Sequence, residues 1–363
     1  MLWQNHRSCS GVNTKTFQLL ELDTLTHITI GACVGEAFLA KRIGKKALLI
    51  GAVAQNLPDI DALDALFLSP AENLLVHRGI THSLLLAFLA PLGFSWVLRK
   101  KFPQVNFLHF YLFFLIQLLL HDFLDVCNSY GTGIFEPFSH QRITFNLLYV
   151  IDPLFTLPLV LSCLALLYLK NQHSARKAWV SLGLISCFLY LSVTLFHKRK
   201  INHSIEESLR TQSITSTDYF TTPTPFNSLL WYAVAAVPGG YQIGYRSVFD
   251  HGWTPFHFVP QREELLRNIQ KEKEVQDLKY FARGFYTISD QDHALQFNVL
   301  RFGQVLGWEN PDAAFAFHFY LNADYDNRLV MQRGRFSGWN QGSIQRMIQR
   351  IGGQQVEAPK TLE

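Results

Sequence analysis

The sequence lacks paired cysteine motifs, a concentrated basic surface and a recognisable leader peptide. Its five cysteines form no CxxC pair, which argues against a cysteine-rich zinc site and against a disulfide framework. The formal net charge of +4 is not gathered as a nucleic-acid-binding surface would be, so no nucleic-acid partner is predicted. Residues 1–20 are polar and have no hydrophobic core, so no secretory signal peptide is predicted either.

Charged residues are also nearly absent from long stretches of the first half. The apolar runs fall at about 27–40, 47–57, 83–98, 107–120, 153–169 and 178–196. The last two contain no Asp, Glu, Lys or Arg over a length that matches the bilayer core, whereas the first two fit a re-entrant hairpin as well as two spans. We therefore predict an α-helical membrane bundle of four to six apolar helices, followed by a small α+β or mainly β soluble domain.

Charged and turn residues return beyond residue 200 and define a second part of the chain. A helical membrane domain is predicted over 22–199 and a linker over 200–228, where TQSITSTDYFTTPTP has no periodic apolar positions. Residues 229–363 are predicted to form a C-terminal α+β domain, because a Pro-Gly-Gly hairpin signal precedes a charged helix and further strands. No catalytic motif is recognisable in this domain.

Basic residues gather in turns between the apolar runs, at 41–46, 99–101 and 170–177. If the helices alternate in direction, these turns share one side of the membrane, which the positive-inside tendency assigns to the cytoplasm. The segment HKRK at 197–200 is the contrary signal. We therefore expect a multi-pass membrane protein in which the face opposite the basic turns lies outside the cytoplasm.

Polar motifs interrupt the apolar half, each at the end of an apolar run. The candidate site residues in them are His27, Asp59, Asp61, His77, Arg78, His82, His121, Asp125, Arg142 and Asp152. Following the alternation of the helices places all of them on the face opposite the basic turns. His121 and Asp125 are spaced i, i+4 and would share a helix face. Imidazole and carboxylate ligands together suit zinc or a similar divalent ion.

The candidate roles follow from side-chain chemistry. The candidate ligands of one or two ions are His27, Asp59, His77, His82, His121 and Asp125, with Zn²⁺ favoured and Mn²⁺ as the alternative. Asp61 is an additional ligand or a base. Arg78 and Arg142 suit an anionic substrate, although ion pairs with the surplus aspartates would explain them equally well. Asp152 is either a site residue or the cap of the next helix.

Five segments in order resemble the bacterial membrane-bound metal-dependent hydrolase family, whose name also mentions LexA-binding inner-membrane hydrolases. They are LDTLTHITIGACVGEA, NLPDIDAL, HRGITHSLL, HDFLDVCNSYGTGIFEPFS and IDPLFTLPL. The resemblance covers about residues 22–200, and because family members begin near DTLTH, residues 1–21 are expected to be an N-terminal extension. It implies an integral protein of the bacterial inner membrane, with the face opposite the basic turns in the periplasm, and with a divalent metal and hydrolytic activity. HRGITHS and PDID are also similar to elements of zinc-dependent phospholipase C domains, which favours a phosphoester.

The function predicted from the sequence is therefore a membrane-bound metal-dependent hydrolase with a phosphoester, lipid or lipid-linked substrate. Two other classes stay open: a metal-ion or proton transporter, in which Asp and His act as relay groups, and a non-catalytic metal-binding membrane scaffold. A transporter predicts ionisable residues through the depth of the spans. Here they gather at one end, which favours the enzyme.

Overall fold

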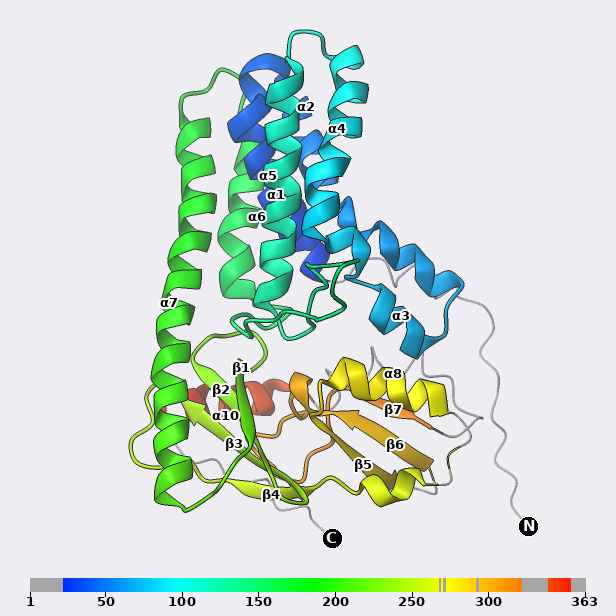
Figure 1. The fold of residues 1–363 in the computed structure, drawn as a ribbon. Helices are drawn as coiled ribbons and strands as arrows, with labels where there is room; N and C mark the ends of the chain where they lie inside the picture. Colours follow the sequence, from blue (N-terminus) through cyan, green and yellow to red (C-terminus); the bar gives the residue numbers. More distant parts are fainter. Residues whose placement is uncertain (1–21, 268, 270–271, 292–293, 322–338, 354–363) are drawn as a thin grey trace, which may run out of the picture.

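A helical bundle stands on a C-terminal α+β domain, for which we keep the name soluble domain (Figure 1). The computed structural model describes residues 22–321 and 339–353, except 268, 270, 271, 292 and 293. The predicted N-terminal extension, residues 1–21, lies outside the described residues. The predicted order of a membrane part followed by a domain with antiparallel sheets is confirmed.

The bundle consists of helices that follow the apolar runs of the sequence. They are α1 (Leu22–Ile43), α2 (Lys46–Gln55), α4 (Leu84–Lys101), α5 (Phe107–Cys127), α6 (Pro153–Tyr168) and α7 (Ala175–Thr211). Side-chain caps fix three of the starts, because Ser83, Asn106 and Asp152 accept hydrogen bonds from backbone N–H groups of the first turns of α4, α5 and α6.

Fewer of these helices are long enough to span a membrane than the sequence predicted. Among the described residues α5 and α7 are long and apolar enough, and a third span results if the segment Pro70–His82 is counted with α4, from which it is bent by 60°. The apolar helices α2 and α6 are shorter. At about 1.5 Å per residue, a helix of the length of α2 covers only half of the hydrocarbon core. The expected four to six spans are therefore not confirmed.

Glycines allow α1 and α2 to pack backbone against backbone. A Cβ atom at Gly51 would lie 2.1 Å from the carbonyl oxygen of Gly31 and 2.8 Å from the Cα of Gly35. Small residues at such positions are typical of membrane helix pairs. At the far end of the bundle, Arg176 of α7 donates to Glu36 of α1 from Nε at 2.7 Å and from Nη2 at 2.6 Å. These contacts fix α1, and with it His27.

Short elements connect the bundle to the soluble domain. The 3₁₀-helix η2 (Pro58–Leu66), helix α3 (Pro70–Val76) and the 3₁₀-helix η3 (Ile80–His82) leave the lower end of the bundle before α4 begins. Figure 1 shows η2 and α3 extending sideways at this level, with the 128–152 loop beside them. Most of the polar motifs of the sequence therefore lie at one rim of the bundle.

The soluble domain contains two antiparallel sheets. The first has the order β1 (Asp218–Pro223), β2 (Leu230–Val237), β3 (Gly240–Ser247) and β4 (His257–Pro260), and the second β5 (Tyr286–Gln291), β6 (Ala294–Val299) and β7 (His318–Tyr320). The helical elements are η4 (Glu263–Leu266), α8 (Glu272–Ala282), η5 (Leu300–Phe302) and α10 (Gln341–Ile351). Aromatic and aliphatic residues of both sheets and α8 form one core, which also takes in Ala71 and Leu74 of α3. The soluble domain is thus packed against the rim of the bundle.

The structure differs from the sequence prediction over 200–228, which was expected to be a linker. Helix α7 continues to Thr211 and β1 follows it. Ile201, Ile205 and Leu209 are spaced i, i+4, i+8 and are buried against Trp231 of β2. This stripe holds α7 against the first sheet, and the two parts of the chain are joined by a continuous helix.

Candidate metal centre

Two histidines and two aspartates converge at the rim of the bundle. His121 and Asp125 lie on one face of α5, His82 ends η3, and Asp59 lies in η2. The Nε2 of His82 is 3.3 Å from Asp125 Oδ2 and 3.5 Å from Asp59 Oδ1, and the Nε2 of His121 is 3.6 Å from each of the same oxygens. One ligand atom from each of the four lies within 4.8 Å of the others. We call these four residues the His/Asp cluster.

The donor atoms of the His/Asp cluster fit a divalent cation. His82, His121 and Asp125 are buried, yet the Nε2 atoms of both histidines and both oxygens of Asp125 make no hydrogen bond to any described residue. A buried polar atom without a partner costs about 1–3 kcal/mol, so several together are unusual in a stable fold. Two imidazoles and two carboxylates match the ligand preference of zinc. A cation bound between them would satisfy the two ring nitrogens and Asp125 Oδ2, the oxygen that faces both of them.

Asp61 holds the histidine rings beside the cluster. Its Oδ1 is 2.8 Å from His77 Nδ1, and its Oδ2 accepts from the backbone N–H of Arg78 at 3.0 Å and from Thr81 Oγ1 at 2.5 Å. The Nδ1 of His82 is 3.2 Å from the same Oδ2, which leaves the Nε2 of His82 facing the cluster. Burial alone would raise the pKa of the Asp61 carboxyl, but hydrogen bonds from His77 and His82 hold this pKa well below its usual range.

His27 and Arg78 contact the cluster from two other sides. His27 Nε2 is 3.4 Å from Asp125 Oδ1, and its ring centroid is 4.2 Å from that of His121. Arg78 Nε is 3.2 Å from Asp125 Oδ2, and its guanidinium lies 4.9 Å from the ring centroid of Tyr130. The backbone of Arg78 is left-handed, with φ of 61°, which is uncommon for a residue with a side chain. This backbone turn directs the Arg78 side chain toward the cluster. In the sequence, Arg78 lies between His77 and His82.

A second group of three possible ligands adjoins the first. Asp59, Asp61 and His77 each offer an atom within 4.8 Å of the others. Asp59 belongs to both groups. The structure thus brings all six predicted ligands to one rim, four of them in the His/Asp cluster, with His27 and His77 next to it.

The guanidinium of Arg142 is engaged by backbone carbonyl groups, whereas the sequence suggested an anionic substrate or an ion pair with an aspartate. Its guanidinium donates to the carbonyl oxygens of Gly131 and His77, each at 3.0 Å, and to that of Leu75. These bonds join the 131–142 loop to the segment after α3. Arg142 is therefore a brace for the backbone around His77, since its donors point at carbonyl groups rather than at the cluster.

Asp152 serves as a helix cap, the second of its predicted alternatives. Its Oδ1 accepts from the backbone N–H groups of Leu154 at 3.0 Å and Phe155 at 3.3 Å, and its Oδ2 from the Tyr190 hydroxyl at 2.6 Å. It also lines a small pocket together with His27. Asp152 thus lies beside the site, with its oxygens engaged in fixing the start of α6.

Contacts from the soluble domain to the site were not predicted. The ring centroid of Tyr130 lies 5.7 Å from that of His77 and 5.2 Å from that of Phe281. Arg301 is buried and donates to the carbonyl oxygens of Phe281 at 2.7 Å and of Ser129. No local pattern in the sequence marks Arg301.

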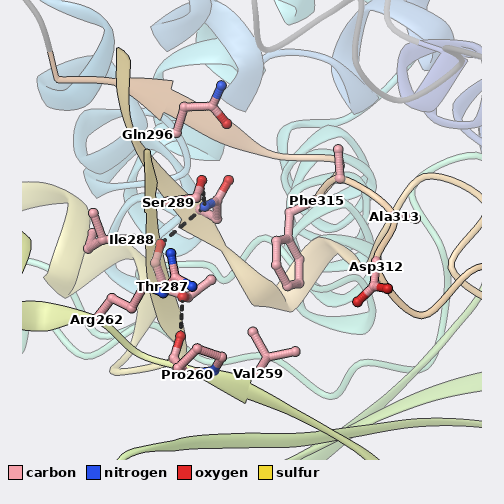
Figure 2. A pocket seen from close by; sticks show the side chains of 12 residues that line it. Val259, Pro260, Arg262, Thr287, Ile288, Ser289, Gln296, Asp312, Ala313 and Phe315 are labelled. Atoms are coloured by element: carbon pink, nitrogen blue, oxygen red, sulfur yellow. Dashed lines mark hydrogen bonds between the residues drawn. The ribbon is translucent and has the colours of Figure 1, made fainter. Parts of the chain in front are cut away.

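The soluble domain contains a cavity of about 190 Å³ between β4, β5 and β6. Figure 2 shows Thr287, Ser289 and Gln296 among its lining residues, with the amide of Asn298 donating to Ser289 Oγ at 2.9 Å. It shares no lining residue with the His/Asp cluster. The residues that carry candidate chemistry therefore lie at the rim of the bundle, not in this cavity.

The fold and the site define a class: a helical membrane protein with a buried His/Asp cluster at one rim and an antiparallel-sheet domain packed against that rim. A family model described as YdjM inner membrane protein matches residues 22–201. The chain is 33% identical over 120 residues to the inner membrane protein YbcI of Escherichia coli strain K12, a match that covers 32% of this chain and 69% of YbcI. The chain belongs to the YdjM inner membrane protein family.

A second relative extends further along the chain. The uncharacterized protein YfhP of Bacillus subtilis strain 168 is 30% identical over 207 residues, which is 55% of this chain and 63% of YfhP. The match thus spans less than two thirds of that relative. No solved structure matches the chain. The prediction of a membrane-bound family at the inner membrane is confirmed.

Proposed function

We propose that this inner membrane protein is a metal-dependent hydrolase that cleaves a phosphoester in a lipid or lipid-linked substrate. The observation that carries the proposal is the His/Asp cluster, in which the buried Nε2 atoms of His82 and His121 and the oxygens of Asp125 converge without hydrogen-bond partners among the described residues. The resemblance of the HRGITHS and PDID motifs to phospholipase C domains supports the phosphoester.

The cluster residues would hold one divalent ion, and Asp59, Asp61 and His77 would hold a second if two are bound. Mixed nitrogen and oxygen ligands favour Zn²⁺, with Mn²⁺ as the alternative. Such an ion supplies Lewis acidity and lowers the pKa of a water molecule toward neutrality. His27, whose Nε2 is 3.4 Å from Asp125, would complete the shell around this ion.

Two further residues prepare the site for an anionic substrate. Arg78 brings a buried guanidinium to within 3.2 Å of Asp125, and a guanidinium binds phosphate with paired hydrogen bonds. Asp61 contacts the Nδ1 atoms of His77 and His82 and thereby fixes the orientation of both rings. Arg78 would therefore stabilise negative charge on the phosphoryl group, and Asp61 would keep the ligands in position.

The proposed topology is multi-pass with the site on the periplasmic side. The basic turns 41–46, 99–101 and 170–177 lie at the ends of the helices opposite the cluster (Figure 1). The positive-inside tendency assigns that end to the cytoplasm. A site at the periplasmic rim meets the headgroup level of the outer leaflet, which is where a lipid phosphoester lies.

Transport of a metal ion or proton fits less well. A relay needs titratable groups along the span. Between His27 and Glu36 on α1, and between His109 and His121 on α5, the sequence has no Asp, Glu, His, Lys or Arg. The interior position next to the cluster is occupied instead by Gln117, whose amide donates to the Gly31 carbonyl oxygen at 3.1 Å.

The proposal is tested by metal analysis and a substrate screen on detergent-purified protein. Wild type is expected to retain zinc or manganese and to hydrolyse a phosphodiester or phospholipid, with the activity lost on chelation. His82→Ala and Asp59→Ala should lose both metal and activity. His109→Ala is the matched control, because His109 lies on α5 at the opposite end and contacts the Phe38 carbonyl oxygen at 2.8 Å. Wild-type protein that holds no ion and hydrolyses nothing with added zinc or manganese would contradict the proposal.

A further inference from the structure

The 3₁₀-helix η2 presents an apolar ridge to the outside of the molecule. Residues i and i+3 eclipse one another in a 3₁₀-helix, so Ile60, Leu63 and Leu66 share one face. Their side chains are 62%, 47% and 64% exposed, and Phe67, directly after the helix, is 84% exposed. We call these four residues the η2 ridge. So many large apolar side chains exposed together on one short element mark an interaction surface.

The same short element carries two aspartates of the site. Asp59 and Asp61 flank Ile60 in the sequence, but both carboxylates turn inward, toward His82 and His77. The 3₁₀-helix η2 is therefore amphipathic: the two site carboxylates lie on one side and the η2 ridge lies on the other. The depth at which the ridge lies fixes the depth of the two carboxylates.

The 3₁₀-helix η2 is joined to the membrane part through η3, which contacts both η2 and α4. The segment Pro70–His82 meets α4 at a bend of 60°, and together they are apolar enough for a span. Phe135 and Phe138 are exposed on a turn next to the start of α4, where the backbone N–H of Leu84 donates to the Ile134 carbonyl oxygen at 3.0 Å. Figure 1 shows η2 leaving the bundle at the end from which α4 starts. Exposed apolar groups thus surround the rim that holds the site.

We propose that the η2 ridge is immersed in the boundary between headgroups and acyl chains of the membrane, and that this contact holds Asp59 and Asp61 at the level of the lipid phosphates. Amphipathic elements that lie in the plane of the interface bury an apolar face in this way. The occupant of the ridge is a lipid surface, because the chain is an inner membrane protein and η2 contacts η3, which packs on the start of α4. If the proposed hydrolase function holds, on which this last step rests, a lipid phosphoester reaches the site without leaving the bilayer.

The immersion is tested first by fluorescence in lipid vesicles. Phe67→Trp, read as the difference from wild type with its seven native tryptophans, should emit at a shorter wavelength in vesicles and lose about half of its added signal to lipids with brominated acyl chains. Phe258→Trp is the matched control, since Phe258 is an exposed phenylalanine of β4 in the soluble domain. Added emission from Phe67→Trp that is quenched no more than that of the control would overturn the proposal.

A kinetic test separates the ridge from the chemistry. The double variant Leu66→Gln with Phe67→Gln should lower kcat/KM on a phosphoester lipid in vesicles by roughly tenfold, since the ridge loses buried apolar area, while kcat/KM on a water-soluble short-chain diester stays unchanged. The apolar pair Leu66→Met with Phe67→Leu should keep both activities. An equal loss of kcat/KM on both substrates would contradict the proposal that the η2 ridge acts through its contact with the membrane. Absence of all hydrolysis in wild type would contradict the proposed function, and the fluorescence result would still decide the immersion.

Discussion

Replacing Asp125 with asparagine removes one charge from the centre of the cluster and preserves its shape. The carboxylate lies within 3.6 Å of nitrogen atoms of His27, Arg78, His82 and His121, so four nitrogen-bearing side chains of the site face it. An amide has nearly the same size as the carboxylate. The variant therefore tests charge rather than packing.

The expected loss of metal affinity follows from Coulomb's law. Two unit charges about 4 Å apart interact by about 4 kcal/mol at an effective dielectric constant of about 20. Since about 1.4 kcal/mol corresponds to a tenfold change in affinity, the interaction with one of the two charges of a divalent ion already sets a lower bound, and removal of the Asp125 charge should weaken binding by at least about a thousandfold. The guanidinium of Arg78, 3.2 Å from Asp125, would then repel the ion without compensation and add to the loss.

The affinity can be measured by competition between chelator-stripped protein in detergent and a fluorescent zinc indicator. Asp152→Asn is the matched control, because this carboxylate caps α6 beside the site and offers no atom to the cluster. It should bind zinc as wild type does. Equal zinc affinity of wild type and Asp125→Asn would refute the assignment of Asp125 as a ligand.

Three further predictions concern the scaffold around the site. Glu36→Ala should leave the buried Arg176 guanidinium without its carboxylate partner and destabilise the bundle by about 3–5 kcal/mol, seen as a lower Tm in detergent, while zinc binding persists. Gly51→Ala should lower the Tm as well, because the new Cβ would lie 2.1 Å from the Gly31 carbonyl oxygen and force α1 from α2. Arg301→Met should expose the junction between the soluble domain and the bundle to limited proteolysis, because buried carbonyl oxygens lose their donor, and Arg301→Lys should protect it in part.

The convergence of the ligands could be predicted because it depends on few elements. His121 and Asp125 are one helical turn apart, so the spacing alone places them on one face of α5. The alternation of apolar runs then assigns each polar motif to a rim. Asp59 and His82 arrive at the same rim by this rule, and the structure places their side-chain atoms within 3.5 Å of each other.

The other features could not be predicted from the sequence, because they depend on contacts between residues that are far apart in the chain. Arg142 has the same charge as Arg78, and only the position of carbonyl oxygens at Gly131 and His77 separates a brace from a substrate-facing residue. The spacing of Ile201, Ile205 and Leu209 is typical of a helix that continues, but the hydroxyl-rich segment that follows suggested a linker. The burial of Arg301 needs the soluble domain to be folded against the 128–132 segment.

The cluster is assembled from elements of unequal rigidity, and this explains why the soluble domain belongs to the site. Helix α5 fixes His121 and Asp125 within one turn, whereas Asp59 and His82 lie on short 3₁₀-helices that have little stability of their own. These short helices flank α3, and α3 is held by burial of Ala71 and Leu74 in the core of the soluble domain. The geometry of half of the cluster therefore depends on the core of the C-terminal domain, and an isolated bundle would present the α5 ligands without fixing their partners.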